Sequence, residues 1–225
     1  MQAIILAAGS HEHSQSREPI KCLLKVGREP LLCHLTRELP PEISEIIIVV
    51  GRQKNQVKEI AGRTLAGRTV RYVTQNEQLG TGHALSLCRP IIHTERFLVL
   101  MGDNLYLKSD IKACLKHPRA ILTKKIDAPE RYGLVSESGH LLVAVTEKPK
   151  NPNGALINCG LYVLDHKIFD IPLAKIGEDE YGLPQQVANL SAIYPVAIEQ
   201  AQFWLPVSTI EDLKQADKYL RRMYS

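Results

Sequence analysis

The sequence predicts an α/β fold, a three-layer sandwich in which helices cover both faces of a mostly parallel mixed sheet. Along the first half of the chain, short runs of β-branched and aliphatic residues alternate with stretches of helical periodicity. These runs are continuously apolar, which is typical of strands that are buried on both faces. The chain has 225 residues, 44% of them hydrophobic, which is enough to bury one substantial core. We therefore expect a single domain over residues 1–225, with its two halves at 1–115 and 116–225.

The first half reads as β-α-β-α-β-α-β. Strands are expected at 3–6, 45–50, 70–73 and 97–101, and helices at 31–39, 55–65 and 81–88, with a further helix starting at Ser109-Asp110. Crossovers between parallel strands are right-handed, so the carboxyl ends of these strands should meet at one edge of the sheet. Ligands of such folds bind along that edge.

After about residue 120 the pattern changes to strands joined by turns, which predicts a mixed or antiparallel extension of the same sheet. Strands are expected at 121–124, 133–136, 141–145 and 156–164, turns at 138–139 and 151–154, and helices at 181–190 and 210–223. Thr209 is a good N-cap for the last helix, and Glu211 and Asp212 follow it at the positive end of the helix dipole.

Composition and charge argue against several classes of protein. The formal net charge is +4, and charged residues of both signs are spread along the chain, which predicts a mildly basic surface without a stripe for nucleic acid. The five cysteines include no C-x-x-C pair, which indicates small core residues in a reducing compartment. The first apolar run is only a strand long, and no segment reaches the roughly 18 uninterrupted apolar residues of a membrane span. We expect a cytoplasmic protein that binds neither nucleic acid nor membrane, with a homo-oligomer left open.

The chemistry begins where the first strand ends. Leu6-Ala7-Ala8-Gly9 reads as a buried strand breaking into a turn of small residues, and Lys21 follows later in the chain. The backbone N–H groups of such a turn, together with one nearby cation, can bind a phosphate chain. The loop between them is rich in histidine and serine and carries Arg17, close before Lys21.

Asp103 follows a fully apolar strand, in the segment Met101-Gly102-Asp103-Asn104. Its carboxylate should emerge at the carboxyl edge of the sheet, beside the Leu6–Gly9 turn if the two strands are close. A single carboxylate there favours a hard divalent cation, because Mg2+ is commonly held by one or two carboxylates together with substrate phosphates. The alternative is an Asx turn that closes the strand.

Gln75 opens a second polar cluster that continues through Gly80, Thr81 and Gly82. Glycines at a strand end would let a flat ring approach the backbone, while Gln75 offers both a donor and an acceptor to the edge of a nucleobase. The alternative is a plain loop with a helix N-cap at Thr81.

Three polar or small positions follow in the second half, namely Gly133, Glu147 and Asn158. Glu147 and Asn158 each lie at an end or interruption of apolar alternation, where a side chain could reach a sugar hydroxyl. Taken separately, each is equally compatible with a structural role.

Together and in this order, these segments resemble the sugar-1-phosphate nucleotidyltransferases, also called nucleoside-diphosphate-sugar pyrophosphorylases, over nearly the whole chain. Leu6–Gly9 with Lys21 resembles the signature loop of the family, and Gln75 with residues 78–84 resembles the nucleotide-base segment of N-acetylglucosamine-1-phosphate uridylyltransferases. Gly102-Asp103 resembles the magnesium-aspartate position. The sugar-binding segments are matched by Tyr132-Gly133, Glu147-Lys148-Pro149 and Asn158-Cys159-Gly160.

The resemblance implies a Rossmann-like fold of the nucleotide-diphospho-sugar transferase type, with a nucleotide-binding half at 1–115 and a sugar-binding half at 116–225. It implies transfer of a nucleoside monophosphate from a nucleoside triphosphate, with UTP or dTTP favoured, to a sugar-1-phosphate, with release of pyrophosphate and with Mg2+ as cofactor. The implied site residues are Lys21, Arg17 and Asp103 for catalysis, Asp103 for the metal, Leu6, Ala7, Ala8, Gly9, Gln75, Gly80 and Thr81 for the nucleotide, and Gly133, Glu147 and Asn158 for the sugar.

Three features depart from the family pattern. His11 and His13 stand where the family usually has a glycine and an arginine, and Glu12 adds negative charge to a loop that should receive a polyanion. Pro206 stands where a second magnesium-binding aspartate belongs. Two hypotheses therefore stay open. One is a working nucleotidyltransferase in which Arg17 or the loop histidines replace the family arginine, and the other is a catalytically weak binding or regulatory relative.

Overall fold

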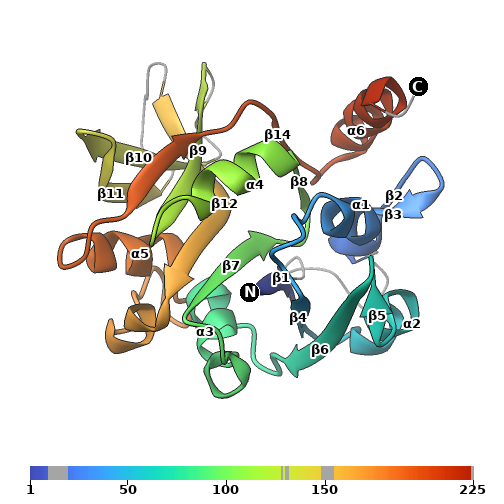
Figure 1. Ribbon diagram of the computed structural model, residues 1–225, viewed down its shortest axis with the longest axis horizontal. Helices are drawn as coiled ribbons and strands as arrows, with labels where there is room; N and C mark the ends of the chain where they lie inside the picture. Colours follow the sequence, from blue (N-terminus) through green and yellow to red (C-terminus); the bar gives the residue numbers. More distant parts are fainter. Residues whose placement is uncertain (10–19, 128, 130–131, 148–154, 224–225) are drawn as a thin grey trace.

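The chain folds around one large mixed sheet (Figure 1), and the computed structural model describes residues 1–9, 20–127, 129, 132–147 and 155–223. The strands of this sheet are β1 (Gln2–Ala7), β4 (Glu45–Val50), β5 (Thr64–Leu65), β6 (Arg68–Thr74), β7 (Arg96–Met101), β9 (Ala120–Ile126), β10 (Gly133–Ser138), β11 (Leu141–Glu147), β12 (Ala155–Asp165) and β13 (Ala197–Gln200). Within the described residues they lie in the order β10-β11-β13-β9-β12-β7-β1-β4-β6-β5. The two halves of the chain share this sheet, because β12 pairs with β7.

The strand directions confirm a mixed sheet. β1 is parallel to β4 and β7, and β4 is parallel to β6, as the sequence predicts for the first half. In the second half, β12 is antiparallel to both β7 and β9, and β10 and β11 form an antiparallel hairpin. The parallel pairing expected in the first half and the mixed or antiparallel extension expected after residue 120 are both confirmed, and in the second half hairpin turns replace several crossover helices.

Helices cover both faces of the sheet, as predicted. One face is covered by α1 (Leu31–Arg37), α2 (Lys54–Ala61) and α4 (Lys108–Leu115), which contribute Leu35, Val57 and Cys114 to one buried cluster. The opposite face is covered by α3 (Gly80–Ser86) and α5 (Leu183–Ser191), which contribute Leu85 and Val187 to a second cluster. The central strands β1, β4, β7 and β12 thus place their alternate side chains into two separate cores, which explains their continuously apolar runs.

Short elements and the last helix complete the fold. They are η1 (Lys21–Leu23), β2 (Lys25–Val26), β3 (Glu29–Pro30), η2 (Arg89–Ile91), β8 (Asn104–Tyr106), η3 (His166–Asp170), β14 (Trp204–Pro206) and α6 (Ile210–Met223). α6 packs beside β2 and β14 at the edge of the molecule (Figure 1). Its predicted N-cap is confirmed, since Thr209 Oγ1 accepts a hydrogen bond from Asp212 N and Asp212 Oδ2 accepts bonds from Ser208 N and Thr209 N.

Two of the predicted boundaries need correction. The helix predicted at 55–65 ends at Ala61, because Gly62 has a φ of +58° and residues Thr64–Leu65 form β5 instead. The helix predicted from residue 181 begins at Leu183. The turn predicted at 138–139 is confirmed by the β10–β11 hairpin, in which Gly139 and His140 both have positive φ. The turn predicted at 151–154 lies outside the described residues.

The partly buried side chain of Arg68 holds the α1–β4 connection. The guanidinium of Arg68 donates hydrogen bonds to the carbonyl oxygens of Ile43 at 2.9 Å, Leu39 at 2.6 Å, Pro40 at 3.2 Å and Ala66 at 2.8 Å. Ile43, Leu39 and Pro40 lie in the α1–β4 connection, and Ala66 lies in the β5–β6 turn. One side chain therefore donates to three carbonyl oxygens of this connection and to one of a neighbouring turn.

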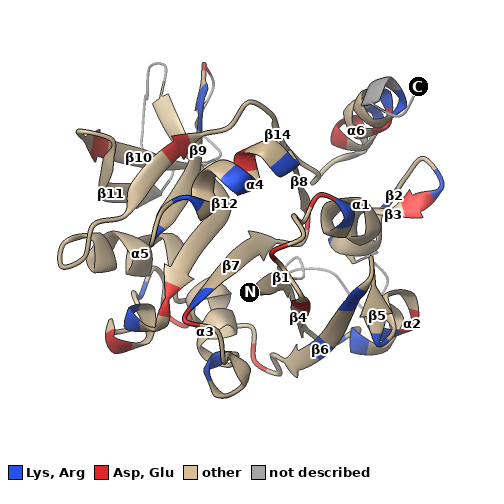
Figure 2. Cartoon of the chain, viewed as in Figure 1, with Lys and Arg blue, Asp and Glu red and all other residues tan. Residues whose placement is uncertain are grey.

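Charge and cysteine placement follow the sequence pattern. Figure 2 shows lysines and arginines interspersed with acidic residues along the ribbon, with both signs present on α4 and α6. All five cysteines are free, and Cys22, Cys88, Cys114 and Cys159 are buried while Cys33 is partly exposed. No helix formed by the described residues is long and apolar enough to cross a membrane.

Candidate active site

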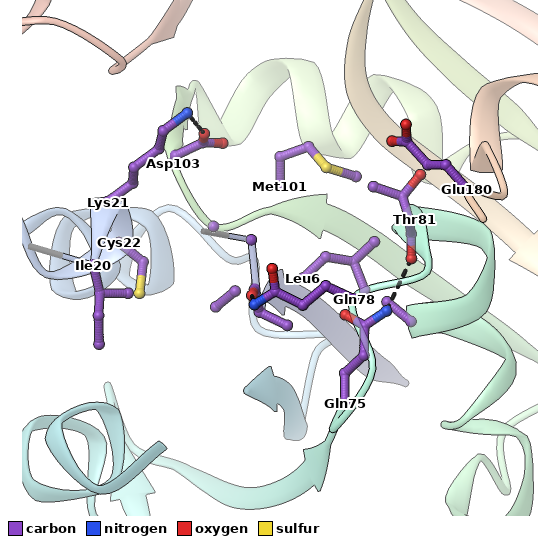
Figure 3. Close-up of a pocket in the computed structure, with 16 residues that line it drawn as sticks. Leu6, Ile20, Lys21, Cys22, Gln75, Gln78, Thr81, Met101, Asp103 and Glu180 are labelled. Carbon is purple, nitrogen blue, oxygen red and sulfur yellow. Dashed lines mark hydrogen bonds and ion pairs between the residues drawn. The ribbon is translucent and has the colours of Figure 1, made fainter. Parts of the chain in front are cut away.

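A cavity of about 390 Å³ opens at the carboxyl ends of β1, β6 and β7, the edge where the sequence predicts a ligand (Figure 3). It is lined by Leu6, Ala7, Ala8, Gly9, Ile20, Lys21, Cys22, Gln75, Gln78, Gly80, Thr81, Ala84, Met101, Gly102, Asp103 and Glu180. All seven residues expected to bind the nucleotide are among them, together with Lys21 and Asp103.

Close backbone packing at two glycines brings the strand ends together. Gly102 N donates a hydrogen bond to Leu6 O at 3.0 Å, and a Cβ on Gly102 would lie 3.1 Å from the same oxygen. A Cβ on Gly51, after β4, would lie 2.7 Å from Ala8 O. Larger residues at either position would push the Leu6–Gly9 turn away from its neighbours, so these glycines set the floor of the cavity.

Lys21 and Asp103 meet at one end of the cavity (Figure 3). Lys21 Nζ lies 3.4 Å from Asp103 Oδ2, and each side chain is 29% exposed. Lys21 is carried by η1, whereas Asp103 lies in the bend between β7 and β8, where its carbonyl accepts a hydrogen bond from Val207 N at 2.8 Å. Two charges predicted from distant parts of the chain thus form an ion pair that a ligand can reach.

Pro206 lies next to this bend. β14 pairs with β8 so that Pro206 is opposite Asn104, the residue after Asp103. The position that the resemblance assigns to a second aspartate is therefore beside Asp103, and proline contributes only a carbonyl oxygen there. No group of three or more His, Cys, Asp or Glu side chains suitable for a metal occurs among the described residues.

The other end of the cavity is formed by Gln75 and Gln78 (Figure 3). Gln75 is buried, with its Nε2 atom 3.0 Å from Gly80 O and 3.2 Å from His83 Nδ1. Gln78 Nε2 donates to Ala8 O at 3.1 Å. Through these hydrogen bonds, the two glutamines connect the loop after β6 to the start of α3 and to the turn after β1.

Gly80 and Gly82 have a packing role that the sequence does not indicate. Gly80 has a φ of +85°, and a Cβ on it would lie 2.5 Å from Tyr181 O. Gly82 N donates to that same oxygen at 2.9 Å. The alternative interpretation of Thr81 as the N-cap of α3 is wrong, because α3 starts at Gly80, and Thr81 Oγ1 instead accepts a hydrogen bond from Leu183 N, the first residue of α5, at 3.0 Å.

The three predicted sugar-binding positions lie on neighbouring strands, and neither Gly133 nor Asn158 is among the residues that line the cavity. Gly133 is opposite Glu147 in the β10–β11 ladder, and Leu134 is opposite Ile157, which precedes Asn158. Asn158 Oδ1 accepts from Gly160 N at 2.9 Å, and its Nδ2 donates to the Tyr162 hydroxyl at 2.6 Å. Asn158 therefore stabilises the irregularity in the pairing of β12 with β9.

Met101 lies between the Asn158–Gly160 segment and the cavity. Gly160 has a φ of +72°, and a Cβ on it would lie 2.5 Å from Met101 Cγ, while Met101 itself lines the cavity. Asn104 Nδ2 donates to Cys159 O at 3.1 Å on the same side. The Asn158–Gly160 segment thus supports the cavity wall from behind.

Several lining residues were not predicted. Glu180 comes from the loop before α5, where its neighbours are also acidic and read as an ordinary solvated turn. Cys22 lies beside Lys21, and its burial, together with the nearby Asp103 carboxylate, raises the pKa of its thiol to about 12. The segment that holds Arg17, His11, Glu12 and His13 lies outside the described residues.

An α/β sandwich with a cavity at the carboxyl ends of its parallel strands belongs to the class of folds that bind their ligands along that edge. The model of one family, described as Nucleotidyl transferase, matches residues 2–222. The chain belongs to this family, which confirms the resemblance drawn from the sequence.

Relatives and solved structures agree with this assignment. The chain is 29% identical over 98% of its length to the bifunctional protein GlmU of Methanocaldococcus jannaschii, covering 54% of that protein. It is 31% identical over 98% of its length to GlmU of Exiguobacterium sibiricum, covering 53%. The chain thus spans about half the length of these curated relatives.

Two solved structures share the fold. A Bacillus anthracis protein described as a glucose-1-phosphate thymidylyltransferase, in complex with sucrose, has a TM-score of 0.83 at 24% identity, covering 98% of this chain and 95% of that one. HddC from Yersinia pseudotuberculosis, in complex with GMP-PN, has a TM-score of 0.75 at 21% identity, covering 97% and 99%.

Proposed function

We propose that the chain transfers a nucleoside monophosphate from a nucleoside triphosphate, with UTP or dTTP favoured, to a sugar-1-phosphate and releases pyrophosphate. The observation that carries the proposal is the polarity of the cavity. The Lys21–Asp103 pair lies at one end, the Gln75–Gln78 pair lies at the other, and the Leu6–Gly9 turn runs between them. This arrangement matches a ligand with a phosphate chain at one end and a base at the other.

The proposed reaction joins two anions. A phosphate oxygen of the sugar-1-phosphate attacks the α-phosphorus, the bond from that phosphorus to the oxygen bridging the β-phosphorus breaks, and the electron pair leaves with pyrophosphate. Such a transfer needs alignment of the reactants and neutralisation of charge, which Lys21 supplies as a cation beside the phosphates. Cys22, the thiol in the cavity, stays protonated at neutral pH because its pKa is about 12, so it is not a nucleophile.

Asp103 is the residue that we assign to magnesium. The donor set near it, one carboxylate and the backbone, is compatible with an ion that takes its other oxygen ligands from a triphosphate and water. When bound, the metal neutralises charge on the phosphates. We assign Gly133, Glu147 and Asn158 to the sugar side, where they share one group of neighbouring strands.

The choice of base rests on residues of this chain. The two structural neighbours are associated with different nucleotides, thymidylyl transfer in one and GMP-PN in the other, so they do not favour one base. The preference for UTP follows from Gln75 and the segment 78–84, and the preference for dTTP follows from Glu147-Lys148-Pro149 and the segment around Trp204. The composition predicts a cytoplasmic protein that does not bind nucleic acid, and this expectation accords with small-molecule substrates.

A second candidate function is a binding or regulatory relative with little turnover. One observation favours it, which is the proline opposite Asn104 where a second carboxylate would assist the metal. Such a protein would bind nucleotide or sugar phosphate without releasing pyrophosphate.

One assay separates the two candidates. Pyrophosphate release is measured with Mg2+ across a panel of nucleoside triphosphates and sugar-1-phosphates for the wild type, Asp103→Asn and Asp170→Asn, the last being an exposed carboxylate at the end of η3. We expect the wild type to release pyrophosphate and Asp103→Asn to lose about 100-fold or more of that activity. Asp170→Asn should keep the wild-type activity. Saturable nucleotide binding by the wild type without turnover for any pair would support the second candidate instead.

A further inference from the structure

We propose that His34 is a positioning residue for the phosphate end of the cavity. It holds β2, which follows Lys21, through a direct hydrogen bond, and one buried water molecule links it to β8, which follows Asp103. This inference rests on the proposed function and adds to it a histidine that does not line the nucleotide cavity.

His34 lies in α1, a helix that contacts both of the segments that carry the charged pair. α1 packs against η1, which begins at Lys21, and against β8, which directly follows Asp103 (Figure 1). The side chain of His34 is 8% exposed. Both of its ring nitrogens therefore need hydrogen-bond partners in the interior.

The first nitrogen, Nε2, holds β2. It lies 3.0 Å from the carbonyl oxygen of Val26, and because a carbonyl oxygen can only accept, Nε2 is the nitrogen that carries the proton. The same helix also holds the chain two residues earlier, since Leu31 N donates to Leu24 O at 2.9 Å. Leu24 N in turn donates to Lys21 O at 3.0 Å. α1 therefore fixes the segment after Lys21 at two carbonyl oxygens, and His34 supplies one of these contacts.

The second nitrogen, Nδ1, is buried and has no hydrogen-bond partner among the described residues. In a neutral ring with its proton on Nε2, Nδ1 is an acceptor, and an unpaired acceptor in the interior is unfavourable. The His34 ring lines a cavity of about 10 Å³. This is roughly the space that one buried water molecule requires. A water in this cavity would donate the hydrogen bond that Nδ1 lacks.

The cavity lies between α1, β8 and the last helix. Its other lining residues are Glu38, Leu105, Tyr106, Leu107, Tyr219 and Leu220. Glu38 and Tyr219 bring a carboxylate and a hydroxyl to this set, and a buried water needs two to four such polar partners. Leu105, two residues after Asp103, shares a small buried cluster with Val26 of β2. The water would thus complete a polar link between two strands that already share apolar contacts.

The spacing of Lys21 and Asp103 depends on how β2 and β8 are held. The two side chains are each 29% exposed at a separation of 3.4 Å, and an ion pair that solvent reaches is too weak to set the backbone positions by itself. The shared cluster of Val26 and Leu105 is apolar, and apolar contacts have no directional preference. A hydrogen bond does have one. His34 therefore supplies the directional contact that fixes β2, and with it Lys21, relative to the Asp103 bend.

Two substitutions separate positioning from packing. His34→Phe keeps an aromatic ring of similar size and removes both nitrogens, whereas the amide nitrogen in His34→Gln can reach the position of Nε2 and still donate to Val26 O. Both variants should fold, because Cys22 of η1 stays anchored in one of the main cores. His93→Phe is the control, since His93 is exposed and its backbone N–H donates to Gln2 at the opposite edge of the sheet.

The readout is the affinity for a nucleoside triphosphate relative to that for its nucleoside. We measure the Kd of UTP and of dTTP with Mg2+ by calorimetry, and the Kd of the nucleoside of the tighter one by NMR titration. Only the triphosphate reaches Lys21, whereas a general structural defect weakens both ligands. We expect His34→Phe to lose about tenfold in triphosphate affinity and to keep its nucleoside affinity within about twofold. His34→Gln should lose less than about threefold for the triphosphate, and His93→Phe should keep both affinities.

Equal losses for triphosphate and nucleoside in His34→Phe, or a loss in His34→Gln as large as in His34→Phe, would overturn the inference while leaving nucleotidyl transfer in place. Crystal structures of the free wild type and of His34→Phe test it without a nucleotide. We expect a water bound to Nδ1 in the wild type and a broken Lys21–Asp103 contact in the variant, and a dry cavity or an unchanged contact would overturn the inference. A wild type that binds no nucleotide would overturn the proposed function, and the two crystal structures would then decide the inference alone.

Discussion

Replacing Gly80 by alanine tests whether the packing of α3 on the Tyr181 backbone holds the cavity in shape. Gly80 has a φ of +85°, and a Cβ would lie 2.5 Å from Tyr181 O and 2.9 Å from Tyr181 N, so the new methyl group meets backbone that cannot turn aside. The positive φ alone costs about 1–2 kcal/mol for alanine, and the overlap adds about 1–3 kcal/mol. We expect Gly80→Ala to lower the free energy of unfolding by about 2–5 kcal/mol.

Gly67→Ala is the matched control for this prediction. Gly67 has a similar φ of +76°, but a Cβ on it would meet nothing within 4 Å. This variant should therefore report the backbone strain alone, about 1–2 kcal/mol. Both variants are unfolded in urea at 25 °C, and the difference between them measures the Gly80–Tyr181 contact. If Gly80→Ala proves no less stable than Gly67→Ala, the contact with the Tyr181 backbone does not constrain α3.

Three further predictions concern stability and metal binding. Arg68→Met should lower the free energy of unfolding, measured in urea, by about 2–3 kcal/mol, because several turn carbonyls lose their donor. Arg68→Lys keeps a donor and should lower it less. Equal losses in the two variants would contradict this reason. Burial raises the pKa of both Cys22 and Cys88 to about 12 from 9.0, so the unfolded chain loses these protons first. The free energy of unfolding should then fall as the pH rises from 9 to 12, by up to about 1.4 kcal/mol per pH unit for each thiol. Cys88→Ala should make this fall shallower when it is measured by urea unfolding. An unchanged slope would refute the assignment of a raised pKa to Cys88. Pro206→Asp should tighten Mn2+ binding to the free protein about tenfold by calorimetry relative to Pro206→Asn, and equal affinities would show that residue 206 does not reach the metal.

The strand-end residues of the site could be predicted because their position depends on local pattern. Leu6–Gly9 and Asp103 each follow an apolar run, and β1 and β7 are neighbours in register from Gln2 opposite Phe97 to Leu6 opposite Met101. Parallel neighbours end at the same edge, so a polar residue just after such a run falls at the cavity without further information.

The remaining parts of the site depend on contacts between distant segments. The glycines around Thr81 were predicted as an approach for a flat ring, yet the group that fills the space beside Gly80 is the backbone of Tyr181. Glu180 enters the cavity for the same reason, since it directly precedes Tyr181. A single sequence contains no signal for this pairing, because neither segment has a pattern that requires the other.

Short strands were missed for a different reason. β13 (Ala197–Gln200) lies between β9 and β11, but half of its residues are polar and it is too short for a clear alternation. Its position is fixed by parallel pairing with β9, from Ala197 opposite Ala120 to Gln200 opposite Thr123. Pairing with an already formed strand can thus specify a strand whose own propensity is weak.

The charge at the phosphate end of the cavity decides how a metal can arrive there. Lys21 and Asp103 compensate each other at 3.4 Å, and Pro206 adds no charge beside them, so the described groups at this end are neutral as a set. A free divalent cation would have to compete with the Lys21 ammonium for one carboxylate, which is a weak position for a strongly hydrated ion. A triphosphate changes this balance, because its oxygens attract Lys21 and supply most of the ligands that the metal needs. If the protein carries out the proposed transfer, magnesium should therefore enter together with the nucleotide, because Pro206 leaves one carboxylate where a second aspartate would build a metal site in advance.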